Sequence, residues 1–437
     1  DLLGLGMLTA IAEGLHLVRA RHGRPAYIYN LPDDPGVYGM IARADTVGVF
    51  QIESRAQMNC LPRTQPQTLY ELAIQVALIR PGPLQGDMVH PYIRRKRGEE
   101  PVEMFHPDVA PILARTLGVP LFQEQGMQLA VAIADFTAVE ADALRRAMGS
   151  QRHRHKLDPL LDKLRAGMAA KGVAPDYAER IIQQIHGFST YGFPESHSTS
   201  FALLVYASCW LKHRHPAEFL CAMLNAQPLG FYSPAALIHD AKRHGVQVRP
   251  PCLARSDWRT TMEGAAVRLG LRQVAGLGTA AQRALEQARQ AGPFQDAADV
   301  VRRAELPRKA LVTLAEAGAF DAFVQPRRQA VWAVLRLARN VQYPLPLGLP
   351  DEAVVALPHQ PAIDRTRADY RTLGLTTGRH PVCYLRPELL RRGALPAVRL
   401  LQCRHGQWVK VAGQVNTRQR PESAKGFFFV TLEDETG

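Results

Sequence analysis

The chain has 437 residues, 46% of them apolar, so its length predicts two to four domains and its composition allows a sizeable buried core. Its formal net charge of +13 favours a polyanionic partner, nucleic acid before an anionic membrane, and no apolar run reaches the roughly 18 residues of a membrane-spanning helix. The six cysteines are scattered without a CxxC pair, which favours reduced thiols in a cytoplasmic protein over a disulfide framework or a zinc site.

The first half of the chain is predicted to be mostly helical. Residues 1–5 are expected to end a strand, and a helix is expected over 7–21, where apolar residues recur on one face. From 45 to 222 the pattern is helical, interrupted by glycine and proline turns. Within it, residues 198–210 are apolar on nearly all sides, which predicts a buried helix.

The second half mixes short strands with helices. Residues 245–272 alternate like short strands, and a compact helical unit is expected over 271–323. Between 325 and 381 we expect one short helix and then a proline-rich connector, followed by strands over 408–437. The predicted fold class is therefore multidomain and mainly α.

Two glycines, Gly276 and Gly278, stand just before a predicted helix whose apolar face includes Ala280, Ala284 and Ala288. A Gly-x-Gly turn lets backbone amides approach a phosphate closely, and the helix N-terminus adds a partial positive charge. The pattern indicates a helix-hairpin-helix contact with the DNA backbone, although an ordinary glycine cap would look the same.

A second unit of this kind follows over residues 306–318. It carries Arg308 and Lys309 at its start and Gly318 at its end, at the spacing of a paired motif. The basic surroundings and the second unit favour DNA binding over simple capping.

Basic residues gather in two further places, around Arg145 and Arg146 and over residues 94–97. Guanidinium groups suit the oxygens of a triphosphate or a DNA backbone. A solvated helix face is the competing interpretation, and for residues 94–97 the two are about equally supported.

His197 lies between two serines where the predicted buried helix begins. Ser196 or Ser198 would be a good N-cap for that helix, and His197 could contact a phosphate. A serine hydrolase is a poor interpretation, because the sequence has no Gly-x-Ser-x-Gly elbow.

Six motifs occur in an order that resembles the alpha subunit of bacterial DNA polymerase III, a family C DNA polymerase. They are residues 1–5 (DLLGL), 49–55 (VFQIESR), 80–84 (RPGPL), 123–125 (QEQ), 144–149 (LRRAMG) and 191–197 (YGFPESH). The resemblance covers essentially the whole chain. The chain resembles the error-prone, damage-inducible version of that subunit more closely, and the residues that suggest this are 85–91, 193–197, 224–228 and 378–381.

This resemblance implies a domain order. It consists of the C-terminal part of a nucleotidyltransferase palm, helical fingers, a tandem helix-hairpin-helix domain, a linker region and the first part of a β-barrel OB-fold. The expected bounds are 1–40, 41–270, 271–325, 326–400 and 401–437. Because both ends interrupt a strand pattern, we expect the chain to be part of a longer protein.

The resemblance also implies a chemistry. Three palm aspartates of this family hold two Mg²⁺ ions that promote attack of a primer 3′-hydroxyl on a deoxynucleoside triphosphate. By position Asp1 is the third aspartate, a catalytic and metal-binding residue, while the other two belong to an Asp-x-Asp motif that lies upstream in the family. We therefore expect this chain alone to be inactive.

The remaining expected roles concern substrates. Arg145 and Arg146 would lie near the triphosphate of the incoming nucleotide, with His197 as a further phosphate contact. The residues expected to bind primer–template DNA are Gly276, Gly278, Arg308 and Lys309.

Residues 342–347 (QYPLPL) have the glutamine and apolar pair of a sliding-clamp peptide but lack its aromatic end. We therefore expect weak or no direct clamp binding, and recruitment by accessory mutagenesis proteins. Two alternatives stay open: the main replicative alpha subunit, and a non-enzymatic DNA-binding protein built from helix-hairpin-helix and OB modules. The long helical segment 45–222 argues against the second alternative, because simple DNA binding needs no fingers domain.

Overall fold

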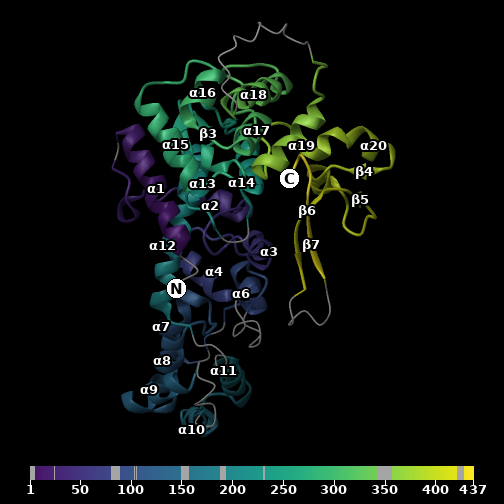
Figure 1. Ribbon diagram of the computed structural model, residues 1–437. Helices are drawn as coiled ribbons and strands as arrows, with labels where there is room; N and C mark the ends of the chain where they lie inside the picture. Colours follow the sequence, from purple (N-terminus) through teal and green to yellow (C-terminus); the bar gives the residue numbers. More distant parts are fainter. Residues whose placement is uncertain are drawn as a thin grey trace. The chain divides into compact units, whose positions relative to one another are not determined.

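The computed structural model of the chain is mainly helical (Figure 1). It describes residues 5–23, 25–79, 89–102, 104, 106–148, 157–187, 193–229, 232–342, 357–420 and 428–437. Contacts divide the chain into two compact units: Leu15–His215, and a second unit made of Asp1–Gly14 with Pro216–Gly437. Over these described ranges, no helix combines the length and the apolar character that crossing a lipid bilayer requires.

The Leu15–His215 unit is built from helices, as predicted for 45–222. They are most of α1 (Leu5–His22), η2 (Ile28–Asn30), α2 (Pro35–Ala42), α3 (Arg55–Thr64), α4 (Leu69–Leu78), α6 (Val89–Lys96), η3 (Pro107–Val109), α7 (Ala110–Leu113), η4 (Ala114–Thr116), α8 (Gln123–Ala134), α9 (Ala138–Ala147), α10 (Leu157–Ala170), α11 (Pro175–Gly187) and α12 (Glu195–Arg214). Helix α12 packs on α4 and α2, while α8 packs on α9 and α10.

Helix α12 confirms the predicted buried helix, because buried side chains surround most of its circumference from Ser198 to Lys212. The predicted serine cap is wrong. The N-cap is Pro194, and the buried Ser198 hydroxyl donates to the carbonyl of Ala73 in α4 instead. A serine at this position therefore anchors two packed helices rather than ending one.

The predicted helix over 7–21 is confirmed as α1. The strand predicted over residues 1–5 is wrong at residue 5, which is already the first residue of this helix. Residues 1–4 lie outside the described ranges. Arg145 and Arg146 lie on α9, as expected, and three of the residues 94–97 form the last turn of α6.

The second unit alternates helices with small sheets. In order it contains α13 (Pro216–Asn225), α14 (Pro234–Arg243), β1 (Val248–Arg249), β2 (Thr261–Glu263), β3 (Ala266–Arg268), η6 (Leu271–Gln273), α15 (Thr279–Gln290), α16 (Ala297–Ala304), α17 (Arg308–Glu316), α18 (Arg327–Gln342), α19 (Ala362–Leu373), η7 (Pro381–Tyr384), α20 (Arg386–Arg391), β4 (Ala394–Leu395), η8 (Ala397–Gln402), β5 (Lys410–Val411), β6 (Gln414–Gln419) and β7 (Phe429–Glu433).

Strands β1, β3 and β2 form one sheet in that order, so the strands predicted within 245–272 are confirmed. Strand β3 pairs parallel to β1 and antiparallel to β2, and all its residues are buried. The helices predicted over 271–323 are α15, α16 and α17. Between 325 and 381 the prediction of one short helix is wrong, because α19 follows α18.

The C-terminal strands are confirmed, with one break. Strand β5 pairs with β4, whereas β6 pairs antiparallel with β7, drawn in yellow in Figure 1. Gly413 lies between the two pairings, and a Cβ there would lie 2.7 Å from the carbonyl oxygen of Glu433. Only glycine permits this approach of two backbones without displacement.

Candidate nucleic-acid interface

The first glycine hairpin precedes α15 as the sequence indicated. Gly276 has a φ of +79°, which a residue with a side chain adopts only with strain, and Gly278 is the N-cap of α15. A bond from the amide of Ala275 to the carbonyl of Thr372 in α19, 2.7 Å long, anchors the turn. Added Cβ atoms on Gly276 and Gly278 would meet nothing within 4 Å, so the turn faces open space.

This hairpin can accept an anion. The first amides of a helix have no partner within the helix, and Gly278 has no side chain to cap them. The apolar face was only partly predicted, because the buried residues of α15 are Leu285 and Ala288, whereas Ala280 is exposed. At the start of α15, backbone amides therefore face outward without a side chain that caps them.

The second unit places two cations at the start of α17. Arg308 and Lys309 are its first residues, both are exposed, and its N-cap is Pro307. Over the described part of the chain, neither side chain donates to a carboxylate or carbonyl. Gly318 ends the unit with a φ of +81°.

Other arginines of this region have structural partners. The carboxylate of Asp299 in α16 pairs with Arg302 at 2.8 Å and with Arg303 at 2.6 Å. Arg303 also donates to the carbonyl of Gly292, and Arg289 donates to the carbonyl of Leu253. Arg308 and Lys309 differ from these arginines, because no carboxylate among the described residues neutralises them.

In the other unit, Arg145 and Arg146 share one carboxylate. Both belong to the last turn of α9, and both pair with Asp142, at 2.9 Å and 2.5 Å respectively. Hydrogen bonds from Arg145 and then Arg146 hold the pKa of Asp142 below its usual value. Arg146 is 71% exposed, so its guanidinium still presents donors to solvent.

His197 lies between two aromatic rings near the start of α12. Its ring centroid is 5.2 Å from that of Phe193 and 4.1 Å from that of Phe201. Phe201 in turn contacts Phe50 edge-on at 5.1 Å. One contact is edge-on and the other tilted, and together they restrict the orientation of the imidazole ring.

Two of the six motifs meet at the starts of α8 and α12. The amide of Gln123 donates to the carbonyl of Phe193 at 3.1 Å, and the amide of Glu195 donates to the carboxylate of Glu124 at 3.0 Å. A third motif contacts α12 further along the helix, where the amide of Phe50 donates to the hydroxyl of Ser208. Residues 80–84 lie outside the described ranges.

Beside this junction lies a cluster that no sequence pattern indicated. The hydroxyl of Tyr70 donates to Glu195 at 2.8 Å, and the guanidinium of Arg115 lies 3.3 Å from the centre of the Tyr70 ring. Burial, followed by the bond to Glu195, raises the pKa of Tyr70. Arg115 is 65% exposed and adds a cation close to His197's helix.

Asp1, the expected catalytic and metal-binding residue, lies outside the described ranges. Among the described residues, one group of potential metal ligands lies wholly within a single unit. It consists of His239, His380 and Glu433, whose ligand atoms lie within 4.8 Å of one another. The carboxylate of Glu433 already accepts from Arg243 and Asn416. This group therefore does not fit the carboxylate set that holds Mg²⁺.

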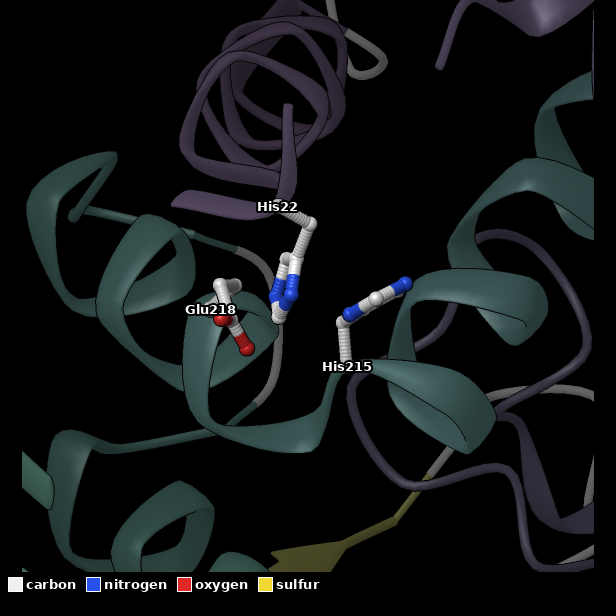
Figure 2. A group of neighbouring side chains, drawn as sticks. All are labelled: His22, His215 and Glu218. Carbon is white, nitrogen blue, oxygen red and sulfur yellow. The ribbon is translucent and has the colours of Figure 1, made fainter. Parts of the chain in front are cut away.

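Two further histidines lie close together in the Leu15–His215 unit. Figure 2 shows His22, at the end of α1, beside His215, which follows α12, with ring centroids 4.9 Å apart. His215 also contacts the ring of Trp210 at 4.9 Å. Glu218, drawn in the same figure, lies on α13 and belongs to the other unit.

Comparisons with known proteins agree with this geometry. Residues 7–172 match the finger domain of the bacterial DNA polymerase III alpha subunit, and residues 245–330 match a helix-hairpin-helix motif. Proteins named error-prone DNA polymerase from Alkalilimnicola ehrlichii, Dechloromonas aromatica and Bordetella bronchiseptica are 52%, 51% and 48% identical to the whole chain. Residues 7–172 therefore belong to the finger-domain family of the bacterial DNA polymerase III alpha subunit.

The chain spans 43% of the length of the first two of these relatives and 42% of the third. Within the family's finger match lie Glu124, Arg145 and Arg146, whereas Glu195 and His197 lie beyond it. The helix-hairpin-helix match includes both glycine turns and the cations of α17. The two matches thus include the arginines of α9 and the glycine turns with the cations of α17, but not the start of α12.

Proposed function

We propose that this chain is the fingers and DNA-binding portion of an error-prone DNA polymerase, which adds deoxynucleotides to a primer 3′-hydroxyl during damage-induced mutagenesis and translesion synthesis. The observation that carries the proposal is the similarity of the whole chain to proteins named error-prone DNA polymerase. Those names also favour this function over the main replicative alpha subunit. The finger-domain match disfavours a DNA-binding protein without enzymatic activity.

In this function, the residues of α9 and α12 act on the incoming nucleotide. Arg145 and Arg146 would donate to triphosphate oxygens, partly leaving Asp142, and His197 would offer a ring nitrogen. Support comes from the exposure of Arg146 and from the two aromatic neighbours of His197. Guanidinium–phosphate bonds are charge-assisted and so about twice as strong as neutral ones.

The second unit would bind primer–template DNA. Gly276 and Gly278 offer free backbone amides, and Arg308 and Lys309 offer cations that no described group neutralises. Such contacts neutralise phosphates without reading bases, which suits an enzyme that must act on any sequence.

The further layout is also proposed. Residues 1–40 would end the palm, 41–270 form the fingers, 271–325 the tandem helix-hairpin-helix domain, 326–400 a linker region, and 401–437 begin an OB-fold. Asp1 would complete a carboxylate set for Mg²⁺ with two upstream aspartates. The enzyme would work in the cytoplasm with accessory mutagenesis proteins. Direct clamp binding through 342–347, most of which lies outside the described ranges, would be weak.

The test uses the full-length protein that contains this chain, with Mg²⁺, deoxynucleotides and a primed template. We expect extension on an undamaged template and past an abasic site, with frequent misincorporation. The chain as given should bind primed DNA in a strongly salt-dependent way without extending it. Failure of the full-length protein to extend any primer would refute the polymerase, and accurate synthesis that stops at lesions would refute only the error-prone type.

A further inference from the structure

Helix α18 carries a tryptophan on its outer face that the structure leaves half exposed. Trp332 is 51% exposed, and it makes no ring contact with any described aromatic or cationic side chain. The opposite face of the helix is buried through Ala330, Val334 and Ala338. The hydrophobic core therefore does not require an aromatic ring at position 332.

Arginines lie one helical turn on either side of this ring. Arg328 and Arg336 precede and follow Trp332 by four residues, so all three lie on one face of α18. Arg336 is exposed and pairs with no described group, whereas Arg328 donates to the carbonyl of Pro358 at 3.2 Å and lies 3.8 Å from Asp364. The face is thus cationic on both sides of an aromatic plane.

A hollow of about 250 Å³ adjoins Trp332, lined by residues of α17, α18 and α19 and by two residues that precede α19. Arg371 of α19 borders it and is held by Glu316 of α17 at 3.0 Å. Gln360 also lines it and has a buried side-chain oxygen without a hydrogen-bond donor among the described residues. A ligand that fills this space would gain by presenting a flat apolar face to the indole.

From this arrangement we propose that Trp332, Arg328 and Arg336 form a binding site for single-stranded DNA, in which one base stacks on the indole. The base would enter the hollow beside Gln360, and the flanking phosphates would meet the two arginines. Stacking on an aromatic side chain beside cations is how proteins hold single strands without sequence preference. This inference rests on the proposed function, because it assigns the site to the polymerase's own template.

The availability of the base favours a single strand over a duplex. A base of a duplex is already paired and covered on both faces by its neighbours, so it can stack on the indole only after it leaves the duplex stack. The hollow is also smaller than the roughly 300–1,000 Å³ of pockets for drug-sized ligands, which suits one planar group. A strand with one base drawn out of its stack therefore matches, and a base-paired helix does not.

The position within the unit agrees with this assignment. Helix α17 begins with Arg308 and Lys309, the proposed duplex contacts, and ends with Glu316 at the hollow. Seven residues separate Lys309 from Glu316, which corresponds to about 10 Å along the helix. A template strand that leaves the duplex at the start of α17 would reach Trp332 within a few nucleotides.

The experiment measures binding of an oligothymidylate of roughly 12 nucleotides to the full-length protein, since single-strand sites span about 4–16 nucleotides. Trp332→Ala should weaken this binding roughly five- to hundredfold, Trp332→Phe should retain most of it, and Arg336→Ala should weaken it and reduce its salt dependence. Leu390→Ala, at a similarly exposed apolar residue of α20, should have no effect. Duplex affinity should stay unchanged in all four variants.

A second measurement does not depend on the variants folding. The unsubstituted protein is irradiated with an oligothymidylate carrying 5-iododeoxyuridine, and the cross-linked peptide should contain Trp332. A cross-link elsewhere, or unchanged oligothymidylate affinity in Trp332→Ala, would overturn the site. The site would also be overturned if Trp332→Ala weakened the binding of an oligoglutamate, a model acidic peptide, and left the binding of the oligothymidylate unchanged. In each case normal primer extension would leave the proposed polymerase function intact.

Discussion

The carboxylate of Glu124 accepts a hydrogen bond from the backbone amide of Glu195, 71 residues further along the chain, at 3.0 Å. Glu124 lies in the first turn of α8, and Glu195 is the first residue of α12, whose N-cap Pro194 has no side-chain donor or acceptor. One carboxylate therefore interacts favourably with the positive ends of two helices. The bond fixes the start of α12 and, with it, His197.

Replacing Glu124 should loosen this junction. We expect Glu124→Ala to destabilise the Leu15–His215 unit by about 1.5–3 kcal/mol, the range for hydrogen bonds to charged groups. Amide hydrogen exchange at the starts of α8 and α12 should accelerate in the full-length protein. Glu124→Gln retains an acceptor oxygen and should show a smaller effect. Equal exchange in Glu124→Ala and the unsubstituted protein would mean that packing alone positions α12.

The paired arginines of α9 should affect nucleotide use more than DNA affinity. In the full-length enzyme, Arg145→Ala and Arg146→Ala are each expected to lower kcat/KM for the nucleotide by roughly 10- to 100-fold, because each removes charge-assisted phosphate bonds. Asp142→Asn removes the carboxylate that pairs with both guanidinium groups, so the KM for the nucleotide should fall or stay the same. Steady-state kinetics should be compared with primer–template affinity. Normal kinetics with weakened DNA binding would identify both arginines as contacts to the DNA backbone.

Each of the two cations at the start of α17 should neutralise one phosphate of the bound duplex. Arg308→Ala and Lys309→Ala should each lower affinity similarly on all sequences and reduce the slope of log K against log salt by about 1. Arg302→Ala is the matched control, since this arginine is 75% exposed but pairs with Asp299. A salt slope that falls in the control and not in Arg308→Ala would place the DNA on a different face.

Local features of this chain were predictable from sequence, and contacts between distant segments were not. The turn at Gly276 follows from glycine's freedom at positive φ, and the pairing of Asp142 with Arg145 and Arg146 follows from helical spacing. The role of Ser198 could not be predicted, because its acceptor, Ala73, lies 125 residues away. Helix α19 was missed since the prolines that precede it indicate a connector.

Glu53, in the second family motif, is expected to make stability depend on pH. Burial raises the pKa of this carboxyl to about 7, above the usual value of 4.5. Between these two values the folded chain keeps a proton that the unfolded chain releases, so stability falls as pH rises through this window. Above pH 7 the loss should reach about 3 kcal/mol, and Glu53→Gln, which stays neutral, should remove it.

Hydrogen exchange of α12 in the full-length protein, followed from pH 5 to pH 8 and corrected for the intrinsic exchange rate, measures this effect locally. Protection should decline with rising pH in the unsubstituted protein and stay nearly level in Glu53→Gln. Glu99→Gln is the control, because Glu99 is about half exposed and pairs with Arg97. A similar decline in Glu53→Gln would assign the pH dependence to another group. A flat profile in the unsubstituted protein would show that Glu53 ionises normally, with water reaching its carboxyl in the folded state.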